Sequence, residues 1–317
     1  MNIDHVLNAM NEYDEQGAIE CFNDLTRQGS LLSRESGSAL LEAAVDRRMP
    51  DMLHRMLTTP PHSTVMRESV STVLLRFVDE VGGTVSVGVD GETEALIFDE
   101  LYPLADVERA LTDGTTIIGQ MTARLSRLGA RYYRDFDFAA AGIRKLVAVH
   151  ELSESTWCAI LRQALIASDF ELATLCEQRC SSRPTFSVEE ACEWVREGNV
   201  APAFEYLKAR GEACEQHELD DLLRAASTLF DYVEEDGGME LQSDYNNDYP
   251  QLGDPYDYFD EMYEYHTSLL VRLLDLGANP LAEARDGTSA LTNLTNPPDS
   301  WDGNHDEVLA RLAKFVQ

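Results

Sequence analysis

Basic residues are scarce in this chain, and lysine is nearly absent. The 317 residues hold 25 Lys and Arg against 57 Asp and Glu, which gives a formal net charge of -32 at pH 7. Only Lys145, Lys208 and Lys314 are lysines. Phosphate backbones and anionic lipid surfaces are both bound by positively charged faces. The composition therefore predicts no direct binding of nucleic acid and no binding to a membrane.

Long apolar runs and a charged leader segment are also lacking. No stretch of the sequence approaches the roughly 18 consecutive apolar residues of a membrane-spanning helix. The N-terminal stretch MNIDHVLNAMNEYDEQG has neither a positively charged region nor an apolar one. Hydrophobic residues make up 44% of the chain, as in an ordinary globular protein. We expect a soluble, cytoplasmic protein whose six cysteines are reduced and mostly buried.

Recognisable catalytic and metal-binding motifs are missing as well. The seven histidines are scattered, and none stands with a nucleophile and an acid at the spacing of a known catalytic set. No glycine-rich phosphate loop occurs. Cys176 and Cys180 share one helix face, but zinc needs two further ligands that are not near them in sequence. The sequence predicts neither an enzyme nor a resident cofactor or metal.

The sequence does contain a recurring pair of short amphipathic helices. In DHVLNAMNEYDEQGAIECFNDLTRQG we expect a break near Gln16 and Gly17 and a helix cap at Gly29. In SALLEAAVDRRMPDMLHRMLTTPP, Pro50 opens the second helix. A short helix pair cannot bury its apolar face alone and is stable only when it is stacked on neighbours. The pattern predicts a mainly α, helical-repeat solenoid with irregular repeats, which forms a single elongated domain over 1–317.

The stretch LLVRLLDLGANPLAEARDGTSAL, Leu269 to Leu291, resembles the junction between two ankyrin repeats. Gly277 stands where the family's glycine ends the outer helix in a left-handed conformation, and Asp286 and Gly287 match the family's hairpin turn. Ala290 replaces the usual Pro, so the motif is degenerate. The resemblance implies an ankyrin-like solenoid and a protein that binds other proteins.

The same stretch gives an expectation about the core. Leu270, Leu273 and Leu274 fall on the outer helix of this repeat, and we expect at least two of them to be buried.

Two segments interrupt the helical rhythm. Residues 83–100, GTVSVGVDGETEALIFDE, alternate Val with polar residues around Asp90 and Gly91 and predict a β-hairpin at about 84–98. Residues 231–265 fall between the two helices of one pair, where insertions into a solenoid lie on one rim. The corresponding turn of the final pair is also long and acidic. The two acidic turns should therefore lie side by side.

The insertion at 231–265 is the most unusual part of the sequence. It holds twelve Asp or Glu, seven of the twelve Tyr, and no Lys or Arg. Carboxylates provide electrostatic steering and charge-assisted hydrogen bonds to Lys and Arg, and Tyr provides a large contact surface at low entropic cost. The segment predicts a docking surface for a basic protein, with a solvated loop as the alternative. The expected contact residues are Asp244, Tyr245, Asp248, Tyr249, Asp254, Tyr256, Asp257, Tyr258, Asp260, Glu261, Tyr263 and Glu264.

These features favour a non-enzymatic protein-binding module. Its most concrete form is a cytosolic acidic inhibitor, such as a bacterial immunity protein or antitoxin, that blocks a basic toxin or another nucleic-acid-acting protein. A nuclease has a positive cleft for phosphate, and an acidic protein can fill that cleft. Two alternatives stay open: a DNA mimic whose carboxylates replace phosphates, and an ordinary ankyrin-type scaffold that is acidic only by lineage.

Overall fold

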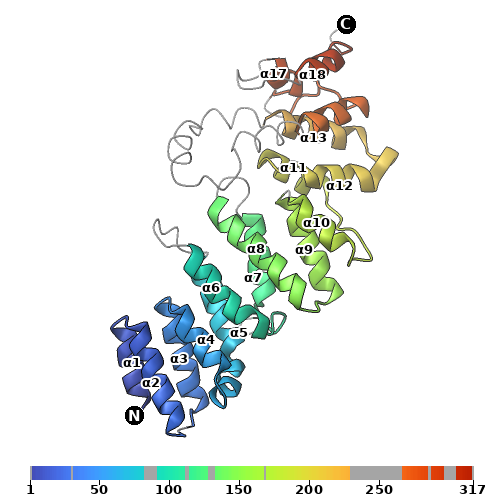
Figure 1. Cartoon of the computed structure of the whole chain (residues 1–317). Helices are drawn as coiled ribbons and strands as arrows, with labels where there is room; N and C mark the ends of the chain where they lie inside the picture. The colour runs from blue at the N-terminus through green and yellow to red at the C-terminus, as the bar shows by residue number, and fades with distance from the viewer. Residues whose placement is uncertain are drawn as a thin grey trace. The chain divides into compact units, whose positions relative to one another are not determined.

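The chain is mainly α-helical, as its sequence predicts (Figure 1). The computed structural model describes residues 2–29, 31–81, 91–110, 114–127, 133–167, 169–228, 266–284, 287–295 and 305–315. It divides into two compact units, Met1–Gln163 and Ala164–Gln317, each of which is described by itself. That the chain forms a single domain over 1–317 stays a prediction.

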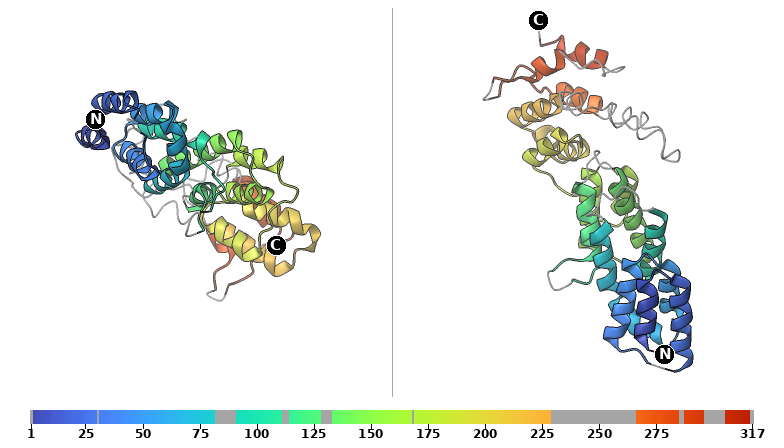
Figure 2. Two further views of the ribbon diagram at one scale, coloured as in Figure 1. Left: turned by 90° about the horizontal axis from the view of Figure 1, so that it is seen from below. Right: turned by 90° about the vertical axis from the view of Figure 1, so that its left-hand side faces the viewer.

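Unit 1 is built from short helices that pack in pairs. Its helices are α1 (Ile3–Asn11), α2 (Glu15–Arg27), α3 (Arg34–Asp46), α4 (Pro50–Thr58), α5 (His62–Val81), α6 (Gly91–Leu101), the 3-10 helix η1 (Tyr102–Leu104), α7 (Ile117–Arg127), α8 (Tyr133–Val149) and the greater part of α9 (Glu154–Ile166). The first helices α1, α3, α5 and α7 contact one another in that order, and the second helices α2, α4 and α6 do the same. Figure 2 shows this side-by-side arrangement for α1 to α4 from two further directions.

Unit 2 follows the same plan. Its helices are α10 (Phe170–Glu177), α11 (Val188–Arg196), α12 (Ala201–Arg210), the 3-10 helix η2 (Gly211–Ala213), α13 (Gln216–Ser227), a helix at 266–275, α17 (Ala290–Thr295) and α18 (His305–Leu312). The first helices α11, α13 and α17 contact one another in that order, and α11 also packs on its pair partner α12.

In several pairs the two helices are joined by the same type of backbone turn. After α1, the Tyr13 N–H donates to the Met10 carbonyl at 3.1 Å and the Asp14 N–H to the Ala9 carbonyl at 3.0 Å. This is the bonding pattern of a Schellman motif, which needs a residue with positive φ, here Tyr13 at 57°. The same two bonds occur around Arg48 after α3 and around Gly198 after α11, with φ of 56° and 92°.

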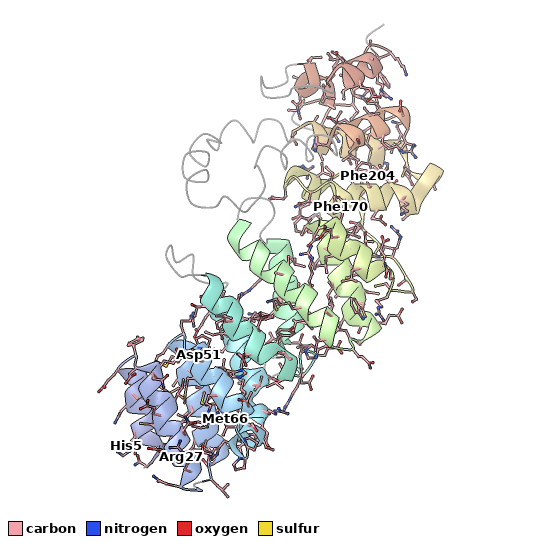
Figure 3. The ribbon with its side chains drawn as sticks, in the orientation of Figure 1. His5, Arg27, Asp51, Met66, Phe170 and Phe204 are labelled. Carbon is pink, nitrogen blue, oxygen red and sulfur yellow. The ribbon has the colours of Figure 1, made fainter. Side chains whose placement is uncertain are left out.

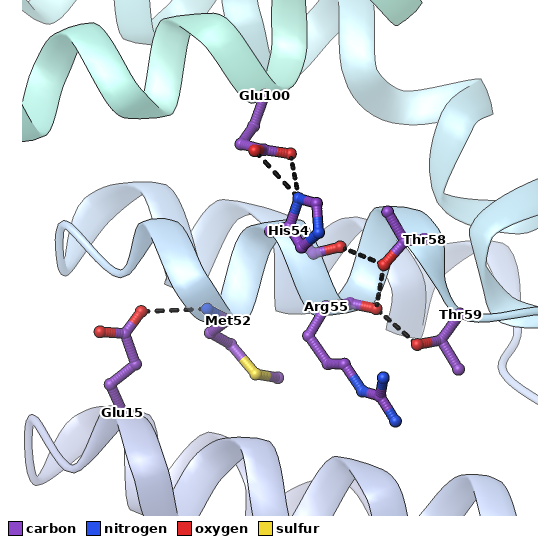
Figure 4. A network of polar contacts seen from close by, with 7 residues as sticks. All are labelled: Glu15, Met52, His54, Arg55, Thr58, Thr59 and Glu100. Carbon is purple, nitrogen blue, oxygen red and sulfur yellow. Dashed lines mark hydrogen bonds and ion pairs between the residues drawn. The ribbon is translucent and has the colours of Figure 1, made fainter.

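Polar side chains connect one helix pair to the next (Figure 4). Glu15 at the start of α2 accepts from the Met52 N–H of α4 at 3.0 Å. His54 of α4 lies 2.9 Å from a carboxylate oxygen of Glu100 on α6. These contacts join successive second helices and hold them in register.

The core consists of the facing apolar stripes of these helices. Leu270 and Leu273 are fully buried and Leu274 is 5% exposed, so the expectation for these three leucines is confirmed. Gly277, at φ 93°, ends the helix at 266–275: its N–H donates to the Leu274 carbonyl and the Ala278 N–H to the Leu273 carbonyl. The left-handed conformation expected at Gly277 is therefore confirmed.

The turn that follows Gly277 is partly described. Glu283 and Ser289 form an antiparallel bridge, and the Ala284 N–H donates to the Thr288 carbonyl at 2.8 Å. Gly287 has φ 84°. Asp286 lies outside the described residues.

Two expectations about local structure are wrong. The break in the first pair lies at residues 12–14, three residues before Gln16 and Gly17, and α2 already begins at Glu15. Asp14 caps α2 by accepting from the Gly17 N–H at 2.9 Å, and a Cβ at Gly17 would meet the Asp14 carboxylate at 2.1 Å. Glycine at position 17 therefore makes room for a cap and does not mark the break.

The predicted β-hairpin at about 84–98 is also wrong for its second half. Residues 91–98 belong to α6, in which Ile97, Phe98 and Leu101 are buried. The alternation of apolar and polar residues ends at Val89, and the apolar run of Ala95, Leu96, Ile97 and Phe98 follows after five residues without one. A short apolar run of this kind occurs in helices and in strands, so periodicity does not separate the two. Residues 82–90, which hold the first half, lie outside the described residues.

Candidate interaction surface

The predicted contact residues of the acidic insertion all lie outside the described residues. They are Asp244, Tyr245, Asp248, Tyr249, Asp254, Tyr256, Asp257, Tyr258, Asp260, Glu261, Tyr263 and Glu264. The structure does describe the two places where the chain leaves and re-enters the helical core, at Thr228 and His266. These two residues mark the base of the insertion.

His266 joins the two ends of the insertion. Its Nε2 donates to the Ala226 carbonyl at 2.6 Å, and the side chain is fully buried. Loss of hydration lowers the pKa of His266 to about 4, although the bond to Ala226 opposes this shift. The imidazole is therefore neutral at pH 7, and it closes the insertion at its base.

Further contacts make α13 and the helix at 266–275 an antiparallel pair. At the far end, Gln216 Nε2 donates to the Gly277 carbonyl at 2.9 Å. Beside it, Asp220 accepts from the Asn279 N–H at 2.6 Å. The two helices are thus joined at both ends, and the long connection between them does not separate them.

The base of the second acidic turn, 296–304, lies at the same place. Asn293 of α17 donates from Nδ2 to Ser227 Oγ at 3.2 Å. Ser227 is the last residue of α13, and α17 ends at Thr295. The residues that precede the two acidic connections are therefore in direct contact.

Several of the few cations of unit 2 form ion pairs within the fold. Arg183 lies 2.7 Å from both Glu177 and Glu205. Arg210 pairs with Glu218 at 3.1 Å. These two arginines balance carboxylates of the fold itself. Other carboxylates of this unit are exposed: Glu189, Glu193, Glu197 and Glu215.

Local hydrogen bonds lower the pKa of two carboxylates, exposed Glu189 and the Arg210 partner Glu218. The pKa of Glu189 is lowered first by its own backbone N–H and then by Ser187, both at the start of α11. The pKa of Glu218 is lowered first by the Glu215 N–H and then by Tyr206. Donors at a helix N-terminus favour the charged form of a carboxylate. Both carboxylates therefore hold their negative charge to a lower pH than an ordinary glutamate does.

The described cysteines are free thiols, and two of them are deeply buried. Burial raises the pKa of Cys176 to about 12 and that of Cys192 to about 11. Since the thiolate is the reactive form, these two thiols are inert at neutral pH. Within the described ranges, no group of three His, Cys, Asp or Glu could hold a metal ion. None of the helices in those ranges is both long and apolar enough to cross a bilayer.

Two open pockets lie among the described residues, one in each unit. The pocket of unit 1, about 400 Å³, lies between α7 and α9 and is lined mainly by small residues such as Gly119, Ala123 and Ala159. The pocket of unit 2, about 370 Å³, lies on the second helices and includes Phe204 and Thr267. Phe204 is labelled on α12 in Figure 3.

Comparison with protein-family models, with curated proteins and with solved structures gives no match. The site must therefore be understood from its own residues. Sequence reasoning missed the contacts of His266 and Asn293, because no motif marks these residues and their partners are distant in sequence. One feature of the sequence does point to His266: it directly follows the insertion and stands at the start of a helix rich in leucine.

Proposed function

We propose that this chain is a non-enzymatic protein-binding module, built of ankyrin-like stacked helix pairs, that binds a basic protein through its acidic connections. The concrete form we favour is an inhibitor, of the immunity-protein or antitoxin kind, whose partner has a positively charged surface for nucleic acid. The helix pairs serve as a rigid support, and the acidic connections supply the contact.

The contact between Ser227 and Asn293 carries this proposal. It supports the view that the two acidic connections, 229–265 and 296–304, leave the helical core at neighbouring points of unit 2. Carboxylates gathered at one place raise the rate of encounter with a basic partner, whereas carboxylates spread evenly add mainly to solubility.

The experiment is affinity capture from the source lysate with the full chain, followed by identification of the captured protein and measurement of its affinity at several salt concentrations. The test variant replaces four acids of the insertion by their amides: Asp257, Asp260, Glu261 and Glu264. The control variant makes the same change in net charge at four exposed acids of unit 1: Glu12, Glu20, Asp51 and Glu151.

We expect a basic partner whose association with the test variant is slower and less dependent on salt, while the control variant behaves like the wild type. Equal loss in both variants would show that overall acidity attracts the partner, which fits a protein acidic by lineage. A captured partner without a basic surface would contradict the proposal.

A further inference from the structure

We draw no further inference here: the strongest candidate, the open pocket of about 400 Å³ between α7 and α9 of unit 1, is lined mainly by small and hydroxyl-bearing side chains, and nothing in the described part of the chain shows which ligand or partner would cover it.

Discussion

The two helices of a pair are joined either by a short turn or by a long connection. They pack against each other in both cases, but different hydrogen bonds hold the joint. After α1, α3 and α11 the turn is closed by two backbone hydrogen bonds around Tyr13, Arg48 or Gly198. After α13 the connection has more than thirty residues, and the helices are joined by side chains, His266 at one end and Gln216 at the other.

This difference shows which part of the sequence sets the pair geometry. The packed faces of the two helices fix their arrangement, and the connection only has to reach between them. A longer connection costs little, about 0.6 kcal/mol for each doubling of its length. The long connection is therefore free to carry residues chosen for other reasons, and its base is closed by His266 in place of backbone bonds.

The largest expected effect comes from opening the long connection at His266 with acid. The pKa of His266 is about 4 in the folded chain and 6.5 ordinarily. Between these values the unfolded chain binds a proton that the folded chain does not, so the free energy of unfolding should fall as pH falls from 6.5 toward 4. The full effect is on the order of 3 kcal/mol. About 2 kcal/mol of this is lost by pH 5. Urea unfolding followed by circular dichroism at pH 7, 6 and 5 measures that part.

The control for this prediction is His266→Gln. The glutamine amide can donate to the Ala226 carbonyl but does not titrate, and the repulsion among the many acids is common to both proteins. The stability advantage of the wild type over His266→Gln should therefore shrink as pH falls. His62 of unit 1 is also buried with a lowered pKa, so His62→Gln reports the same effect away from the insertion. An advantage that is constant from pH 7 to 5 would show that His266 does not close the connection in the way described.

A smaller effect is expected when a short turn is broken. Gly198 has φ 92° between α11 and α12, a conformation that a β-branched residue resists. Gly198→Val should lower the free energy of unfolding by about 1–3 kcal/mol. Gly277→Val is the comparison, because no atom lies within 4 Å of a Cβ built there and the cost is purely that of the backbone. Thermal midpoints equal to that of the wild type in both variants would mean that a positive φ at these two glycines does not contribute to the stability of the fold.

The same contrast explains how much of the structure could be predicted from the sequence. Apolar periodicity predicted the helix pairs, and Gly277 marked a left-handed cap because glycine favours that conformation. Tyr13 and Arg48 carry no such mark, so the sequence predicts the break of the first pair near Gln16 and Gly17, whereas it lies at residues 12–14. The run from Ala95 to Phe98 fits a strand as well as a helix, and only its packing in unit 1 decides between them.

The candidate site was less predictable than the fold. Composition pointed to the acidic insertion, but the contacts at its base join residues about forty or more positions apart, as in His266 to Ala226 and Asn293 to Ser227. The groove beside Phe204 is likewise lined by residues of three helices that are far apart in the sequence, so only the packing of those helices brings them together.

The smallest expected effect comes from making the short turn of unit 1 resemble that of unit 2. Tyr13 has φ 57° and a 75% exposed side chain, so its backbone strain is not offset by burial of the ring. Tyr13→Gly should relieve a left-handed strain of about 1–2 kcal/mol and lose part of this gain, about 0.4–1 kcal/mol, to the greater freedom of glycine in the unfolded chain. The net result should be a stabilisation of up to ~1 kcal/mol, measured as a higher urea midpoint with an unchanged slope. Tyr13→Ala keeps the strain and should give no such gain, so a gain of equal size in both variants would mean that removal of the exposed ring, and not relief of the turn, is responsible.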